Sequence, residues 1–197
     1  MSLKELTIEH HRSAERSGFA KTLLSGSIDP RLYYQYLLNQ FYIYHTLEEA
    51  IADVRYKGGI AFPVKLYPIF RSKLISKDIM ELRELYEFPA DMPLEISTIK
   101  YINYIEELAL YNDYRALLAH VYVRHFGDLH GGQIIKKRIP GSGAMYEFDK
   151  PEELKSSLRM MLDDKLAPEA NKCFEYATAL FEELHNGSLG ISNRSGE

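Results

Sequence analysis

Several features that would indicate a particular class of protein are scarce in this sequence. It contains one cysteine, Cys173, and no tryptophan among its 197 residues. A single cysteine excludes an internal disulfide and a metal site built from cysteines, and it fits a reducing compartment. Positive charge is not in excess, because the formal net charge is −4. The composition therefore gives no sign of nucleic-acid binding, which usually needs a basic surface.

Long apolar runs without charge are also missing. Residues 1–5 lack the apolar core of a signal peptide, and no apolar run approaches the length that crosses a bilayer. We therefore expect a soluble, cytoplasmic monomer without a membrane anchor. The hydrophobic fraction of 46% and the charged fraction of 26% are ordinary for a globular chain.

Helical periodicity runs along nearly the whole chain. Asp29 followed by Pro30 predicts one helix start, and Ser76 is expected to cap another helix. The pattern predicts an all-α fold, a single domain of about eight helices over residues 1–185, with a flexible polar tail over 186–197. The expected helices cover 4–16, 30–56, 64–72, 77–86, 94–110, a helix that starts at 112 or 113 and ends by 140, 150–163 and 168–184.

One stretch, residues 124–138, is unusual because it places three glycines within six residues of a helical run. Each glycine inside a helix costs about 1 kcal/mol relative to alanine. Gly127 and Gly131 stand at i and i+4 and share a face, with Gly132 and the carboxylate of Asp128 beside them. The glycines alone leave two interpretations open: a flat ligand lies on bare backbone, or a second helix packs closely there.

The first predicted helix carries a candidate metal ligand. His11 and Glu15 lie four residues apart, so the carboxylate can orient the imidazole, as it does for many metal-ligating histidines. A solvated surface pair is the alternative interpretation. His10 is a competing candidate, although Glu15 suits it less well.

Basic residues form two further groups. Lys155 and Arg159 lie at i and i+4, and with Lys4 they could hold a dianionic ligand such as a pair of carboxylates. A solvated basic face is the alternative. The second group follows the glycines and comprises Lys136, Lys137 and Arg138, with Arg124 earlier on the same helix. Such a basic patch can bind an acidic protein partner, or it can simply increase solubility.

Other catalytic templates do not match. The sequence has no glycine-rich phosphate loop after a strand, no nucleophile elbow and no His-Glu-x-x-His zinc motif. A di-iron bundle needs paired Glu-x-x-His motifs, and residues 182–185 supply only one.

The remaining motifs resemble those of the heme oxygenases, and the resemblance covers residues 4–184. Residues 11–15, His-Arg-Ser-Ala-Glu, are similar to the proximal segment of that family. Residues 127–133, Gly-Asp-Leu-His-Gly-Gly-Gln, are similar to its distal helix signature. The resemblance implies that heme b is sandwiched between the first helix and the glycine helix.

The same resemblance implies a role for each site residue. His11 is expected to ligate the heme iron and Glu15 to orient it. Asp128 is expected to anchor an ordered water network with Tyr44 and Arg124, at the open iron face bordered by Gly127 and Gly131. The other residues expected near the heme are Lys4, Lys155 and Arg159 at the propionates, and Tyr122, Gly132 and Phe174 at the ring.

The activity implied is oxidative cleavage of heme by O2 at the α-meso carbon, giving biliverdin IXα, carbon monoxide and ferrous iron. Electrons are expected from reduced ferredoxin, docked near residues 136–138 and Arg124, as in the soluble cyanobacterial and algal enzymes. A bilin reductase is a possible downstream partner. The alternatives are a heme-binding or heme-sensing module without turnover, and a thiaminase-like helical enzyme with Cys173 as nucleophile.

One residue departs from the family pattern. The chain has His130 where heme oxygenases usually have serine. We expect this side chain to point away from the iron or to form a local hydrogen bond, because Asp128 and the glycines are intact.

Overall fold

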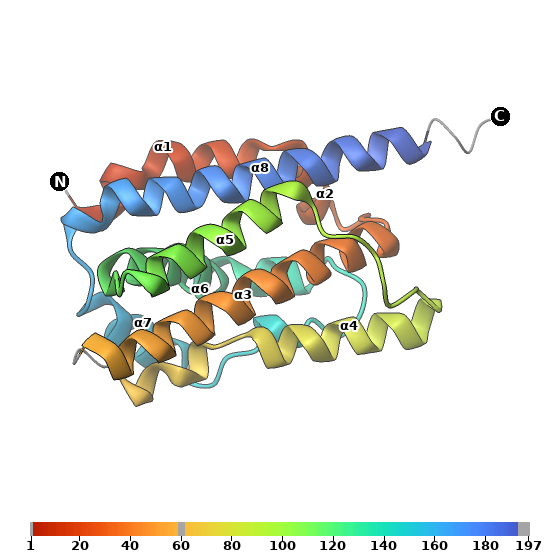
Figure 1. The fold of residues 1–197 in the computed structure, drawn as a ribbon. Coiled ribbons are helices and arrows are strands. Elements are labelled where there is room, and N and C mark those ends of the chain that lie inside the picture. Colours follow the sequence, from red (N-terminus) through yellow and green to blue (C-terminus); the bar gives the residue numbers. More distant parts are fainter. Residues whose placement is uncertain (1, 59–61, 193–197) are drawn as a thin grey trace.

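The structure, a computed structural model, describes residues 2–58 and 62–192. Within these residues it consists of eight α-helices and three short 3-10 helices and has no strand, which confirms the predicted all-α fold (Figure 1). In chain order the elements are α1 (Leu3–Arg16), α2 (Gly18–Ser25), α3 (Pro30–Gly58), η1 (Val64–Ile69), α4 (Ser72–Tyr86), α5 (Ile96–Leu110), α6 (Tyr114–Lys136), η2 (Ala144–Tyr146), α7 (Pro151–Arg159), η3 (Asp164–Leu166) and α8 (Ala167–Ser192).

Local capping explains where two helices begin. The hydroxyl of Ser2 accepts a hydrogen bond from the backbone N–H of Glu5, and the Glu5 carboxylate accepts one from the N–H of Ser2. This reciprocal pair satisfies two of the N–H groups that a helix start leaves free. The carboxylate of Asp29 accepts from the N–H groups of Arg31 and Leu32, which confirms the predicted start at Pro30.

Other boundaries differ from the prediction. The helix α2, over residues 18–25, was not expected, although Ser17 caps its start and Gly26 ends it in the left-handed region at φ 80°. The segment predicted as a helix over 64–72 is the 3-10 helix η1. The helix α8 continues to Ser192, so the expected tail is helical up to that residue, and 193–197 lie outside the described residues.

The start of α4 also differs from the prediction. This helix begins at Ser72 and not after Ser76, because a residue from a distant helix caps it. The carboxylate of Glu48, on α3, accepts hydrogen bonds from the backbone N–H groups of Arg71 and Ser72 and from the Ser72 hydroxyl. A carboxylate at a helix start is favourable both as an acceptor and through the helix dipole.

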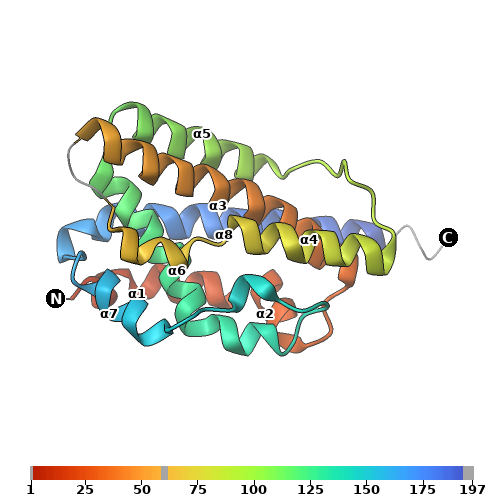
Figure 2. The same ribbon diagram turned by 90° about the horizontal axis from the view of Figure 1, so that it is seen from below.

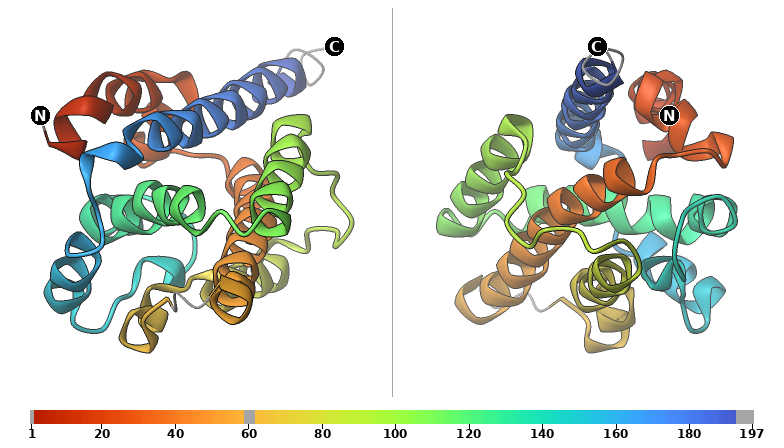
Figure 3. Two further views of the ribbon diagram at one scale, coloured as in Figure 1. Left: turned by 60° about the vertical axis from the view of Figure 1, so that its left-hand side comes forward. Right: turned by 90° about the vertical axis from the view of Figure 1, so that its right-hand side faces the viewer.

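The helix α6 lies between the two halves of the molecule. On one side α1 runs along α8, and on the other α3 packs between α4 and α5 (Figures 1 and 2). Both groups contact α6, which passes between them (Figure 3). The stretch with three glycines is therefore in the middle of the fold.

Two buried charged residues hold the segment around η2 beneath α6. The guanidinium of Arg71 donates to the carbonyl oxygens of Phe70 and Glu147 and lies 3.9 Å from the ring centroid of Phe148. The carboxylate of Asp78 accepts from the backbone N–H groups of Ala144 and Met145, 2.7 and 2.9 Å away. These bonds fix η2, whose last residue packs against α6. None of the described helices is long and apolar enough to span a membrane.

Candidate functional site

The three glycines of α6 serve two different purposes. A methyl group built on Gly127 or Gly131 would meet no atom within 4 Å, whereas one on Gly132 would lie 2.7 Å from Cδ1 of Tyr146. Gly127 and Gly131 therefore leave bare backbone facing open space, and Gly132 allows close packing. Close packing therefore applies at Gly132, while a flat ligand on Gly127 and Gly131 stays a prediction that their open space permits. Tyr146 fills the space where a Cβ of Gly132 would lie, and the expected contact of Gly132 with heme stays a prediction.

A ladder of three polar contacts joins α3 to α6. The side chains from α3 recur every four residues and so share one face of that helix. Each reaches a polar side chain of α6 within the otherwise apolar core: Tyr44 with Asp128 at 2.6 Å, Gln40 with Arg124 at 3.5 Å, and Glu48 with His125 at 3.3 Å.

Asp128 is electrostatically unusual. Burial raises the pKa of its carboxyl to about 6, against the lowering effect of the hydrogen bond donated by Tyr44 and of nearby positive charges. Burial and the charge of Asp128 raise the pKa of the Tyr44 phenol well above its ordinary value. Tyr44 is therefore a fixed donor, while Asp128 changes its protonation near neutral pH. A group with such a pKa suits proton transfer.

The guanidinium of Arg124 is buried with unused donors. Its Nη1 donates to Gln40, and its Cζ lies 5.0 Å from the ring centroid of Tyr101. Within the described residues its Nε and Nη2 have no hydrogen-bond partner. Buried donors without partners are costly, so water or a ligand is expected to complete them. Since Arg124 is only 7% exposed, the prediction that it helps to dock an electron donor is wrong.

Sequence reasoning missed a second polar network behind Arg124. The hydroxyl of Tyr101 lies 2.7 Å from Nδ1 of His120 and 3.1 Å from Sγ of Cys173. The other nitrogen of His120 lies 2.9 Å from a carboxylate oxygen of Glu169. A signal was available, because His120, Arg124 and Asp128 recur every four residues along α6. Cys173 is fully buried, so its interpretation as a nucleophile open to a substrate is not supported.

The proximal candidate lies on α1. Nδ1 of His11 is 3.4 Å from the Glu15 carboxylate, and its ring meets the ring of Phe174 edge-on at 5.6 Å. This leaves Nε2 of the exposed His11 as the atom available to a metal ion. The competing His10 points its own Nε2 at Glu175 on α8, 3.5 Å away. The structure therefore favours His11 over His10 as a ligand.

The predicted cations lie on two elements. On α7, Lys155 donates to Glu152 at 2.8 Å, and Nη2 of Arg159 lies 3.4 Å from Nε2 of His130. Lys4 is exposed on α1, seven residues before His11 and so on the same side of that helix. Whether Lys4 joins the α7 pair around one ligand stays a prediction.

Two aromatic residues connect these parts of the site. The rings of Tyr122 and Phe126, both on α6, lie 5.6 Å apart, and Cζ of Arg159 lies 5.2 Å from the ring centroid of Phe126. Burial raises the pKa of the Tyr122 phenol, against a hydrogen bond with Thr7 of α1. Tyr122 thus lies on α6 close to α1, and its place near a bound ring stays a prediction.

His130 forms the local hydrogen bond that was expected of it. Its Nδ1 lies 2.8 Å from the backbone carbonyl oxygen of Phe126, one turn earlier on α6. This bond ties the imidazole to its own helix.

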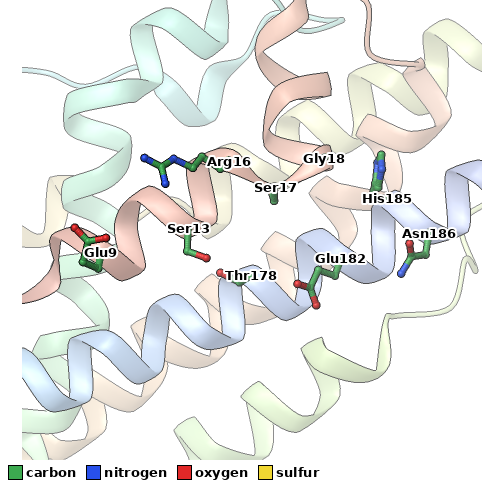
Figure 4. Close-up of a pocket in the computed structure, with 9 residues that line it drawn as sticks. All are labelled: Glu9, Ser13, Arg16, Ser17, Gly18, Thr178, Glu182, His185 and Asn186. Carbon is green, nitrogen blue, oxygen red and sulfur yellow. The ribbon is translucent and has the colours of Figure 1, made fainter.

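A separate groove of about 460 Å³ lies between α1, α2 and α8. Its lining includes Glu9, Ser13 and Arg16 of α1 and Glu182 and His185 of α8 (Figure 4). Helical periodicity places these α1 residues on the side opposite His11 and Glu15. The groove therefore lies on the other side of α1 from the candidate metal ligand His11.

The structure is thus a helical protein with an exposed histidine oriented by a carboxylate on α1 and a bare, polar-edged stretch on α6. Comparisons with known proteins identify the class. The profile of the heme oxygenase family matches residues 1–183, and the chain belongs to this family. Its activity is accordingly that of a heme oxygenase, and heme is its substrate.

Individual relatives agree with this assignment. The chain is 29% identical to a heme oxygenase of Guillardia theta, over 97% of this chain and 88% of the relative. It is 30% identical to heme oxygenase 2 of Macaca fascicularis, over 99% of this chain and 68% of the relative. The crystal structure of heme oxygenase-1 from the cyanobacterium Synechocystis, in complex with heme, has a TM-score of 0.79 and 26% identity, covering 98% of this chain and 96% of that one.

The residues present fit a heme. Gly127 and Gly131 leave open space beside the helix, where a flat ring needs bare backbone. The contact of Nδ1 of His11 with Glu15 leaves the other ring nitrogen, Nε2, available to a metal ion. The unpartnered donors of Arg124 lie buried on the same helix as the glycines.

The two kinds of glycine predict opposite effects of alanine. In the heme-free protein, Gly132→Ala should lower the free energy of unfolding by about 2 kcal/mol, because the new methyl group overlaps Tyr146. Gly127→Ala should raise it by about 1 kcal/mol, because it meets no atom and improves helix propensity. Urea unfolding at equilibrium measures both. Equal effects of the two substitutions would contradict the assignment.

The raised pKa of Asp128 predicts a contribution to the free energy of unfolding that depends on pH. The folded state holds this proton more tightly than the unfolded state, so the carboxyl favours folding below about pH 4, and this advantage is lost as the pH rises through about 6. Asp128→Asn should therefore stabilise the heme-free protein at pH 7.5 by about 2 kcal/mol, with the gain disappearing near pH 4. Urea unfolding at both pH values tests this, and a gain that does not change with pH would refute it.

Proposed function

We propose that this heme oxygenase cleaves heme at the α-meso carbon, giving biliverdin IXα, carbon monoxide and ferrous iron, with electrons from reduced ferredoxin. The observation that carries the proposal is the hydrogen bond of 2.6 Å from Tyr44 to Asp128, whose pKa is raised to about 6 beside the bare glycine face. This supports a proton-exchanging group at the edge of the space proposed for the ring.

The residues that would hold the heme iron and the propionates come from two helices, α1 and α7. His11 would ligate the iron through Nε2, with Glu15 fixing the imidazole through Nδ1. Lys155 and Arg159 of α7, with Lys4 of α1, would bind the propionates as charge-assisted partners. When bound, heme supplies an iron that binds and activates O2, and its own ring is the group that is oxidised.

The protein supplies proton control on the distal side. Asp128 exchanges protons near neutral pH, and the Tyr44 hydroxyl holds the carboxylate in one orientation. The free N–H groups of Arg124 would hold water for the transfer of those protons. Gly127 and Gly131 keep side chains out of the space in which O2 and the ring meet.

Relatives support heme as the substrate. The Synechocystis heme oxygenase-1 structure is a complex with heme, and a second Synechocystis enzyme, 26% identical with a TM-score of 0.73, was solved with heme and NO. These structures hold heme in the same fold. The product isomer and the electron donor rest on the resemblance of the motifs in residues 11–15 and 127–133.

Basic residues at the end of α6 are the proposed docking site for ferredoxin. Lys137 and Arg138 are exposed, while Lys136 is partly exposed and paired with Glu147. An acidic electron-transfer protein would be attracted to this patch. Arg124 takes no part in docking because it is buried.

Aerobic reconstitution tests the reaction. When ferric heme, the protein and ascorbate are mixed in air, the Soret band should decay while bilin absorbance appears, and chromatography should identify biliverdin IXα. Asp128→Ala should lower the bilin yield at least roughly 100-fold, because proton transfer is lost. A wild-type heme complex that stays intact would instead indicate a heme-binding module without turnover.

Axial ligation is tested by spectroscopy of the ferric and ferrous complexes. His11→Ala should lose the iron–imidazole stretching band in the resonance Raman spectrum, because Nε2 of His11 is the only proposed ligand. His10→Ala is the matched control and should keep the band, since that imidazole contacts Glu175. Loss of the band in the control alone would move the ligand to His10.

Docking is tested by charge reversal. Lys137→Glu should slow turnover driven by reduced ferredoxin by about tenfold at low ionic strength, because it replaces an attractive charge by a repulsive one. Turnover driven by ascorbate should not change. Lys100→Glu, an exposed lysine on α5, provides the control, and equal rates for both variants with ferredoxin would dismiss this surface.

A further inference from the structure

His130 joins the distal helix α6 to the end of α7. Its Nδ1 lies 2.8 Å from the carbonyl oxygen of Phe126, which only accepts, so Nδ1 carries the proton. Its Nε2 lies 3.4 Å from Nη2 of Arg159, which only donates, so Nε2 is the acceptor. The two contacts together require the neutral imidazole with its hydrogen on Nδ1.

Phe126 provides a second contact to the same guanidinium. Its ring centroid lies 4.2 Å from that of His130 and 5.2 Å from Cζ of Arg159. A guanidinium is attracted to an aromatic face, by about 0.5–1 kcal/mol at an exposed site. Arg159 is therefore held by a lone pair and a π face, both supplied by α6.

Neither Nε2 of His130 nor the ring of Phe126 carries a negative charge. Lys155, one turn earlier on α7, forms an ion pair with the exposed carboxylate of Glu152 at 2.8 Å. Among the described residues, by contrast, no carboxylate lies within ion-pair distance of Arg159. Arg159 is thus positioned without a direct ion pair, although Glu152 is near enough to feel its charge, and its donors remain able to pair with an anion.

We propose that His130 is a positioning residue that, with Phe126, presents the Arg159 guanidinium to one heme carboxylate. The inference rests on the proposed function, in which Arg159 binds a propionate. Because His130 directly precedes Gly131, it fixes Arg159 relative to the bare glycine face. This would select the in-plane orientation of the ring and hence the meso carbon that lies beside Gly127 and Gly131.

A double-mutant cycle on the affinity for ferric heme tests the coupling. His130→Ser should weaken binding roughly fivefold, the size expected for one hydrogen bond. In an Arg159→Gln background the same substitution should have little further effect, because its partner is already gone. With heme dimethyl ester, which lacks the charged carboxylates, His130→Ser should bind within about twofold of the wild type.

Two further measurements distinguish a positioning role of His130 from a general structural role: rescue of heme affinity by a conservative substitution, and the orientation of the bound ring. His130→Gln places an amide oxygen near the position of Nε2 and should restore the affinity to within about twofold of the wild type. Proton NMR of the ferric complex should show one set of heme methyl resonances for the wild type and a second set for His130→Ser. Both readouts are independent of turnover, so they stand even if the wild type produces no bilin.

Three results would overturn the proposal. Additive losses in the cycle would show that His130 and Arg159 act independently. An equal loss of affinity for the dimethyl ester would show that His130 only shapes the site. An unchanged set of methyl resonances in His130→Ser would show that ring orientation does not depend on it.

Discussion

The structure depends on one partly buried hydrogen bond, from the Tyr44 hydroxyl to the Asp128 carboxylate. Burying a carboxylate is unfavourable unless it is paired, and this bond provides the partner while fixing the register of α3 against α6. The adjacent contacts of Gln40 with Arg124 and of Glu48 with His125 follow from that register. Glu48 also caps α4, so the same face of α3 organises the neighbouring helix.

Close packing behind α6 is what allows its front to remain bare. The ring of Tyr146 packs against Gly132. The side chains of Arg71 and Asp78 hold that ring in place through hydrogen bonds to the backbone around η2. The helix is therefore supported on one side. On the other side Gly127 and Gly131 need no side chains for stability, which frees that face for a flat ligand.

Local patterns in the sequence predicted what local physics determines. The helical fold, the helix start at Asp29 and the pairing of His11 with Glu15 all depend on residues a turn apart. Contacts between distant segments could not be predicted in this way: the capping of α4 by Glu48, and the packing of Tyr146 on Gly132. Residue type alone also cannot decide whether a side chain is buried. The sequence suggested that Arg124 belongs to a basic surface patch, whereas the fold buries it in the core.

The site combines groups with opposite electrostatic requirements on one helix. Asp128 needs burial, which raises its pKa and costs stability at neutral pH. Arg159, which meets α6 through His130 and Phe126, needs to keep its full charge near solvent. Asp128 and the residues that hold Arg159 all lie within residues 126–131 of α6. A change in the position of this segment therefore alters both proton supply and the proposed carboxylate contact. Rigid support of α6 from both halves of the fold therefore serves the chemistry directly.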